Sequence, residues 1–268
     1  MKAPDVPEGR MTRAGRAEWT KLRTDASNGW LTLGMIALTV AVGAAVAMTS
    51  RCDATGCAGD PARLSLTGVM VGQVVVAVVA ALMVGNEYST GMMHTTLTAM
   101  PRRLTVLCSK SAVLSAVTLV AGAVSVLGSL LIGRLVQPGR GFTEQHGFAA
   151  LSLTDAPTLR AAVGSVCYLV LIGLLSLGIA LVVRSSATAV GIVLALLFVF
   201  PILAQVVADP DWQRHLRQIS PMTAGLAVQT TVGVDDLPIG PWQGLGVVAL
   251  WAAGAMAAGG WLLSSRDA

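Results

Sequence analysis

The chain has 268 residues, of which 54% are hydrophobic and only 12% are charged, and its formal net charge is +4. Soluble globular proteins carry about twice this share of charged residues, so the composition excludes an ordinary soluble domain. The basic excess does not indicate binding to nucleic acid, because no basic stripe alternates with aromatic residues, which make up only 4% of the chain.

Six apolar runs dominate the chain. Each is long enough to cross about 30 Å of hydrocarbon as a helix. The runs lack the alternation of barrel strands, so they predict helices. We therefore expect an all-α membrane protein with one transmembrane domain at 31–263, an N-terminal segment at 1–30 and a tail at 264–268. The predicted spans are 31–49, 65–85, 111–133, 161–183, 187–208 and 244–263.

The segment before the first span predicts an amphipathic helix. Trp19, Leu22 and Trp30 recur at helical spacing, and Arg23 belongs to a separate basic stripe. Tryptophan favours headgroup depth and cations favour anionic lipid, so we expect an interfacial helix in contact with the bilayer. The same helix is also suited to docking against a partner protein.

Two of the four cysteines, Cys52 and Cys57, lie in the loop that follows the first span. Cys108 and Cys167 lie in or beside spans, so only the first pair would meet an oxidising environment outside the cell. We expect this pair to form either a structural disulfide or two free thiols. A zinc site would need two further ligands that the loop does not supply.

The interiors of the six runs contain no Asp, Glu, Lys, Arg or His. Ion-coupled carriers and intramembrane hydrolases usually place such residues there, so both classes are disfavoured, and we expect no catalytic residue and no metal site. Gln73 is one of the few polar residues in the spans, and we expect it either to line a pathway or to join helices. The chain has no Walker A loop, so energy for active transport would have to come from a partner.

The segment between spans 2 and 3 predicts a short cytoplasmic helix. Its apolar residues recur at helical spacing between a hydroxyl cap and a proline stop. Such a methionine-rich helix could fit a groove on another protein, or it could fold onto the bundle. Glu87 and His94 are expected to be polar surface residues rather than catalytic groups. The helix comprises Met93, Leu97 and Met100, with Ser89 or Thr90 as the cap and Pro101 as the stop.

The segment between spans 5 and 6, at 209–243, is long for a connector. Trp212, Leu216 and Ile219 recur at helical spacing, and Pro221 is suited to start a second short helix. Without a partner, such an amphipathic helix is expected to lie on the outer surface. The aspartates of this segment are expected to be solvated rather than to bind a metal.

The distribution of Lys and Arg predicts the orientation. Basic residues are more frequent on the side that comprises the two chain ends, the segment between spans 2 and 3 with Lys110, and the turn between spans 4 and 5 with Arg184, than in the segments on the opposite side. Cytoplasmic segments of membrane proteins are the more basic ones. We therefore expect both termini in the cytoplasm.

The segment between spans 2 and 3 resembles a motif of actinobacterial ABC-2 type permeases, the membrane subunits of ATP-binding-cassette exporters. Residues 18–23, 63–66 and 220–221 are similar to the same family, so the resemblance extends over nearly the whole chain. His94 stands where an arginine is commoner, and 25–29 is less bulky than the usual elbow. The motif comprises Glu87, Tyr88, Ser89, Thr90, Gly91, Met92, Thr95, Thr96, Leu97, Pro101, Arg102 and Arg103.

The resemblance implies a six-span subunit in the bacterial plasma membrane that pairs with a second permease, usually a copy of itself, and with two ABC ATPase subunits. ATP and Mg would bind the ATPase, and this chain would bind no cofactor and catalyse no reaction. Glu87 to Arg103 would couple to the ATPase, Glu18 to Trp30 would form the elbow, and the segment between spans 5 and 6 would dip back into the membrane.

The apolar spans suggest a hydrophobic or amphipathic cargo for such an exporter. Two other functions remain open from the sequence. The sparse polarity of the spans is also compatible with a membrane anchor or sensor subunit that has no pathway. A facilitator that is not coupled to an energy source is the third alternative.

Overall fold

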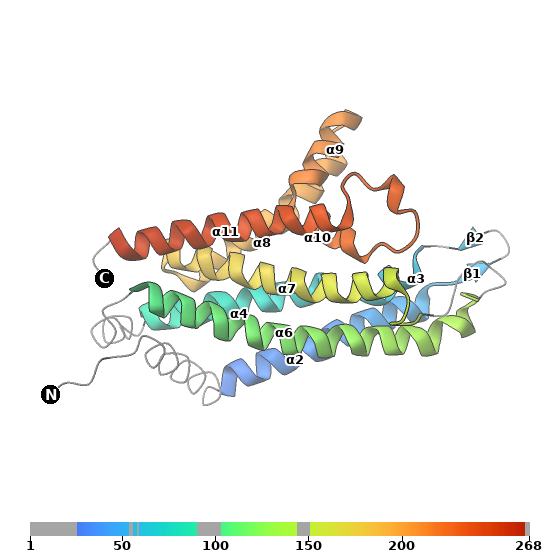
Figure 1. Cartoon of the computed structure of the whole chain (residues 1–268), viewed down its shortest axis with the longest axis horizontal. Helices are drawn as coiled ribbons and strands as arrows, with labels where there is room; N and C mark the ends of the chain where they lie inside the picture. Colours follow the sequence, from blue (N-terminus) through green and yellow to red (C-terminus); the bar gives the residue numbers. More distant parts are fainter. Residues whose placement is uncertain (1–25, 54–55, 58, 90–102, 144–150, 266–268) are drawn as a thin grey trace.

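The computed structural model describes residues 26–53, 56–57, 59–89, 103–143 and 151–265. Its long helices lie side by side along the long axis of the molecule (Figure 1). Six of them are long and apolar enough to cross a membrane, which confirms the predicted number and indicates a multi-pass membrane protein. These spans are formed by α2 (Ala26–Thr49), α4 (Val69–Ser89) with the short α3 before it, α6 (Arg103–Val136), α7 (Ala156–Val183), α8 (Ser186–Val206) and α11 (Pro241–Ser265).

The two ends of the bundle differ (Figure 1). We call the end where α2 and α6 begin and α4 and α11 end the terminal end. The opposite end, which we call the loop end, carries the small sheet and the short helices near it. The short elements are β1 (Cys52–Asp53), β2 (Gly56–Cys57), α3 (Pro61–Leu66), η1 (Gln137–Arg140), α9 (Pro210–Ile219), α10 (Pro221–Leu226), η3 (Ala227–Gln229) and η4 (Val234–Asp236).

Three of the short helices begin with the same local device, a capping side chain followed by proline. Asp60 precedes α3, Asp209 precedes α9 and Ser220 precedes α10, and each accepts a hydrogen bond from a backbone N–H of the first turn. Proline suits the first helical position because the helix leaves that N–H without a partner. The expected second helix after Pro221 is therefore present as α10.

The second span is divided. α3 ends at Leu66 and α4 begins at Val69. Between them Gly68 lies so close to the carbonyl oxygen of Thr39 on α2 that a Cβ at this position would clash with the backbone. This contact brings the first two spans together. It also explains why a glycine stands at the junction.

α4 and α7 form the centre of the bundle, and α2 and α8 lie at its periphery. The core around α7 contains Leu169, Ile172 and Leu175, which are fully or almost fully buried. α2 and α8 bury only a small share of their residues within the chain. Their outer faces are therefore available to lipid or to a second protein.

Three exposed tryptophans of the spans lie at two levels along the bundle, while Trp251, which is 37% exposed, lies between these levels on α11. Trp30 and Trp261 are 74% and 68% exposed at the terminal end, and Trp242 is 58% exposed near the start of α11. At the helical rise of 1.5 Å per residue, Trp242 and Trp261 lie about 28 Å apart along α11. This separation matches the hydrocarbon thickness of a bilayer, at whose interfaces tryptophan is enriched.

Only the end of the predicted N-terminal interfacial helix lies within the residues that the structure describes. α2 begins at Ala26, so 26–30, which we expected in a separate interfacial helix, belong to the same helix as the first span. Trp30 is accordingly a residue of α2. Trp19, Leu22 and Arg23 lie outside the described residues, so the elbow helix stays a prediction.

The first loop contains a two-stranded antiparallel sheet in which Cys52 is paired with Cys57 and Asp53 with Gly56. Directly opposite positions on antiparallel strands bring their Cβ atoms to about 4.5–5.5 Å. The backbone thus places the two cysteines opposite each other. The cysteine side chains are not among those described, so the disulfide stays a prediction.

Candidate functional site

The segment between α4 and α6 was expected to couple the chain to an ATPase. Glu87, Tyr88 and Ser89 form the end of α4, and Arg103 is the first residue of α6. The structure therefore shows the two helices that flank the segment. The remaining residues named for it, which lie outside the described residues, are Thr90, Gly91, Met92, Met93, His94, Thr95, Thr96, Leu97, Met100, Pro101 and Arg102.

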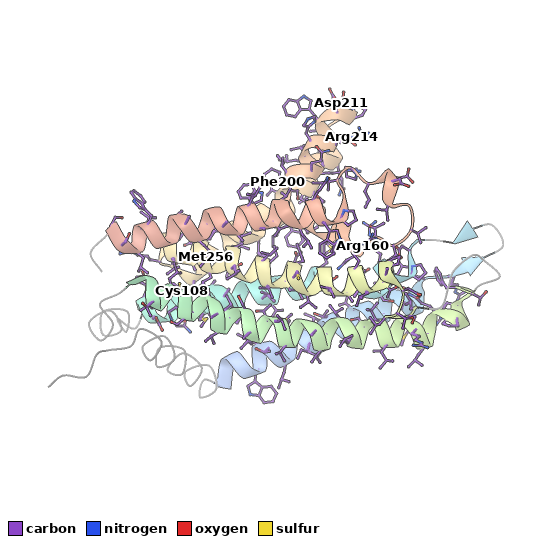
Figure 2. All side chains as sticks on the ribbon, viewed as in Figure 1. Cys108, Arg160, Phe200, Asp211, Arg214 and Met256 are labelled. Carbon is purple, nitrogen blue, oxygen red and sulfur yellow. The ribbon has the colours of Figure 1, made fainter. Side chains whose placement is uncertain are left out.

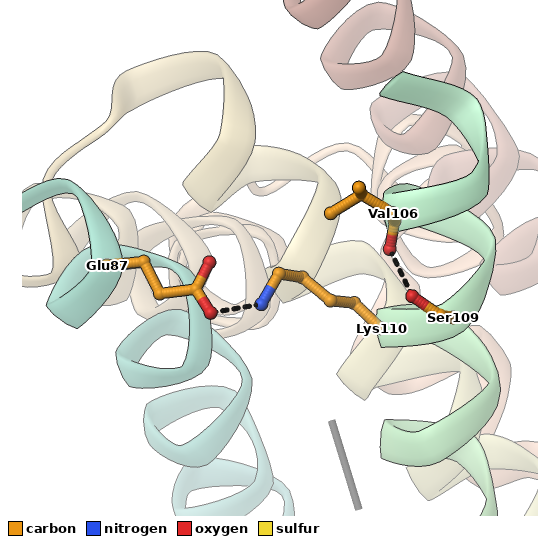
Figure 3. A network of polar contacts seen from close by, with 4 residues as sticks. All are labelled: Glu87, Val106, Ser109 and Lys110. Carbon is orange, nitrogen blue, oxygen red and sulfur yellow. Dashed lines mark hydrogen bonds and ion pairs between the residues drawn. The ribbon is translucent and has the colours of Figure 1, made fainter. Parts of the chain in front are cut away.

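Glu87 and Lys110 form a buried ion pair between these flanking helices (Figure 3). Lys110 Nζ donates to Glu87 Oε1 at 2.7 Å, and the two side chains are only 1% and 7% exposed. The expectation that Glu87 is a surface residue is therefore wrong. A carboxylate at the end of one span can be buried because the long lysine side chain reaches it from the next span. Burial of a charge is costly unless it is paired and hydrogen-bonded.

Buried apolar residues lie within one helical turn of each member of the pair. Val84 and Leu107, each within one turn of a charged residue, belong to a buried cluster that also includes Leu181 of α7 and Leu263 of α11. The neighbouring Ser109 Oγ donates to the carbonyl of Val106 in its own helix, at 2.9 Å (Figure 3). The ion pair is thus a polar link between α4 and α6.

The end of α4 also contacts the turn that joins α7 to α8. The guanidinium carbon of Arg184 lies 5.4 Å from the centre of the Tyr88 ring, which is cation–π distance. Gly85 lies against Ser186, and a Cβ at position 85 would clash with the backbone and the side chain of Ser186. The last turns of α4 are therefore held by α6 on one side and by the α7–α8 turn on another.

Gln73 takes part in a second buried group, in the middle of the bundle. Its Nε2 donates to Met222 Sδ of α10 at 3.2 Å, and its Oε1 accepts a hydrogen bond from the Tyr168 hydroxyl of α7. Gln73 and Tyr168 are fully buried and Met222 nearly so. Gly225 of α10 lies against the Tyr168 ring. This geometry favours the alternative in which Gln73 joins helices over the one in which it lines a pathway.

The segment between α8 and α11 extends away from the bundle as α9 before it returns as α10. Figures 1 and 2 show α9 projecting outward, with Asp211 and Arg214 near its far end. α9 has no buried residue, whereas most of α10 is buried against α11 and α8. Asp235 and Asp236 lie along an open polar cleft of about 540 Å³ together with Arg214 and other α9 residues.

The described residues were compared with the ligand groups that hold metal ions in proteins. No group of three or more His, Cys, Asp or Glu side chains is gathered among these described residues. Asp209 accepts hydrogen bonds from the backbone of its own helix at Asp211 and Trp212. The aspartates of this segment thus have capping and surface positions.

Sequence patterns did not reveal Lys110 or Arg184 as part of the site. Both were read only as cytoplasmic charges that set the orientation. The one available signal is that Glu87 closely follows the predicted span 65–85 and Lys110 directly precedes the next one, 111–133, so both lie at the same end of two consecutive spans. A scan against protein-family models finds no match to this chain, and a search of curated proteins finds none either.

Proposed function

We propose that this chain is the permease subunit of an ABC exporter, which forms the substrate pathway and takes its energy from a separate ATPase. The observation that carries the proposal is the buried Glu87–Lys110 ion pair. It joins the two helices between which 90–102 lies. A displacement of that segment by a partner would move α4 and α6 together, because separating two buried charges is costly.

The contacts of Tyr88 and Gly85 support the same mechanism. They connect the end of α4 to the α7–α8 turn. A movement that enters at 90–102 would therefore reach four helices through one junction. In this proposal the terminal end lies in the cytoplasm of a bacterial cell and the loop end lies outside. ATP and Mg bind the partner, and this chain itself catalyses no reaction.

The proposed pathway lies between this chain and a second copy. The centre of the single chain is filled by Tyr168 and Gln73. Along α2, and bordered by Val75 of α4, an open and largely apolar groove of about 510 Å³ includes Trp30, Gly34 and Ala41. Nothing lies within 4 Å of the place that a Cβ at Gly34 would take. Small residues allow helices of two subunits to approach closely. An apolar cavity between two copies fits a hydrophobic or amphipathic cargo.

The proposal predicts that an ABC ATPase is encoded beside this chain. It is tested by co-expression of that ATPase with the chain, followed by affinity purification through a tag on the permease. We expect the ATPase to copurify with the native chain. Charge reversal at Arg102 and Arg103 should remove the ATPase, while reversal at the exposed Arg51 of the loop end should leave it bound. Retention of the ATPase in the first variant would contradict the coupling assignment.

A second measurement separates the exporter from its alternatives. Vesicles that contain the complex should accumulate a fluorescent amphipathic dye only when MgATP is present. Accumulation to the same level without ATP would identify a facilitator. A native chain that neither copurifies with an ATPase nor moves dye would favour the membrane anchor.

A further inference from the structure

Asp60 joins two segments that are far apart in the sequence. Its carboxylate Oδ1 accepts hydrogen bonds from the backbone N–H groups of Ala62 and Arg63, at 3.0 and 3.3 Å, and so caps α3. The same carboxylate accepts from the hydroxyl of Thr231 at 2.7 Å, from the N–H of Thr231, and from the N–H of Val232 at 3.0 Å. Hydrogen bonds to a charged acceptor are about twice as strong as neutral ones.

The segment 230–232 depends on side chains for its position. It lies between η3 and η4, and the N–H groups of Thr231 and Val232 donate to Asp60 rather than within a helix or sheet. On its other side Arg160 of α7 donates from Nη2 to the carbonyl of Thr230 at 2.6 Å. Figure 2 shows Arg160 toward the loop end of α7. Two side chains of opposite charge therefore hold this segment against the bundle.

The helix that begins after Asp60, α3, is hydrogen-bonded to the end of the third span. Gln137, at the end of the third span, donates from Nε2 to the carbonyl of Pro61 at 2.8 Å and to Ser65 Oγ at 3.0 Å. These bonds attach α3 to the long helix α6. The position of α3 thus depends on contacts with α6 as well as on those with 230–232.

The closed position of this segment leaves polar groups unsatisfied. Thr230 is 5% exposed, and its Oγ1 has no hydrogen-bond partner among the described residues; the same holds for the buried Nε of Arg160. Thr230 lines an open cavity of about 530 Å³ together with Asp60 and Val232. Buried polar atoms without partners cost free energy, which release of the segment into water would recover. The Asp60 bonds oppose this release.

We propose that Asp60 is a positioning residue that latches 230–232 over the loop end, and that release of this latch is a step of the transport cycle. The second half of this inference rests on the proposed exporter function, and the first half does not. Asp60 belongs to the same span as Glu87, through α3 and α4. A displacement that enters at the Glu87 end can thus reach the latch through one span.

The test follows the accessibility of position 230. Thr230→Cys is introduced into the full chain with Cys52 and Cys57 replaced by serine, and the protein is placed in nanodiscs, which leave both membrane faces open. A membrane-impermeant maleimide is added, and the labelled fraction at position 230 is followed by peptide mass spectrometry. In the presence of Asp60 we expect slow labelling, since residue 230 is buried.

Adding Asp60→Asn should increase the labelling rate about ten-fold or more, because it weakens several hydrogen bonds to a charged acceptor at once. Thr231→Val removes only the hydroxyl bond and should give a smaller increase, whereas Thr231→Ser should label like the parent. The matched control is Asp209→Asn. Asp209 caps α9 through the same two kinds of backbone bond as Asp60 caps α3, but its bonds stay within its own helix.

Labelling that is unchanged in Asp60→Asn, or equally accelerated in Asp209→Asn, would overturn the latch. Rapid labelling of the parent would do so as well, since the segment would then not be closed. The ATPase and MgATP are added in a separate arm, where turnover should accelerate labelling in the Asp60 parent. Acceleration by Asp60→Asn without any effect of MgATP would support the latch and contradict the exporter function.

Discussion

Replacing Lys110 with methionine removes one member of the buried ion pair while preserving most of the length of the side chain. The Glu87 carboxylate then loses an ammonium 2.7 Å from its Oε1. Its side chain is only 7% exposed, so water can replace that ammonium only in part. We therefore expect a large loss of stability from this single substitution.

The magnitude follows from the burial of the pair. Removing one partner of a buried ion pair costs about 3–5 kcal/mol, whereas replacing both partners by apolar residues of similar volume is often neutral or stabilising. Chains of this size lose roughly 2–4 °C in unfolding midpoint per kcal/mol. Lys110→Met should therefore lower the midpoint by roughly 6–20 °C. Glu87→Met combined with Lys110→Met should recover most of that loss.

The measurement is thermal unfolding of the purified protein in detergent at one fixed heating rate. The midpoints are compared as apparent values, because membrane proteins of this kind commonly unfold irreversibly. The matched control is Arg134→Met, at the far end of the same helix α6, where the side chain is exposed. Substitutions at such sites usually change stability by less than about 0.5 kcal/mol.

Two results would refute this reasoning. A midpoint for Lys110→Met equal to that of Arg134→Met would show that the ion pair does not hold α4 to α6. A double variant that loses the sum of the two single effects would show that Glu87 and Lys110 act independently, since residues in direct contact are expected to be non-additive.

Two further substitutions, Gly68→Ala with Gly34→Ala as its control and Tyr168→Phe, test the packing that positions the site. Gly68→Ala should lower the unfolding midpoint by several degrees, because its Cβ would clash with the Thr39 carbonyl, whereas Gly34→Ala should be neutral or slightly stabilising, because nothing lies within 4 Å there. Tyr168→Phe should cost about 1–3 kcal/mol, since it removes the donor to the buried Gln73 oxygen. Both are measured by the same unfolding assay, and equal midpoints for Gly68→Ala and Gly34→Ala would contradict the close helix crossing.

The six spans could be predicted because their signal is local. An apolar run of suitable length can be recognised without knowing which residues it will contact. Most of the helices in the structure are longer than the predicted runs by a few residues at one or both ends. The helices after Asp209 and Ser220 were accessible for the same reason, through amphipathic spacing and a proline at the first position. What the local pattern could not show is that α9 leaves the bundle and that α10 returns to it.

The polar contacts that define the site could not be predicted, because each joins residues on different elements. Gln73 and Tyr168 are 95 positions apart, and Asp60 and Thr231 are 171 apart. A single sequence contains no signal for such pairs. Glu87 illustrates the consequence, since a lone carboxylate after an apolar run has the same local pattern whether it meets water or the ammonium of the next span.

The position of Gln73 restricts how the second span can move. Counted at 1.5 Å per residue, Gln73 lies about 20 Å from Asp60 and about 21 Å from Glu87, so it is close to the midpoint between the two charged ties. Sliding of this span along α7 would break the hydrogen bond to Tyr168 and leave two buried polar groups without partners. A tilt about Gln73 keeps that bond and moves the two ends of the span in opposite directions. Among these two rigid-body movements, a tilt is therefore the one that costs less in the middle of the bundle, and it displaces Asp60 by about as much as Glu87, in the opposite direction.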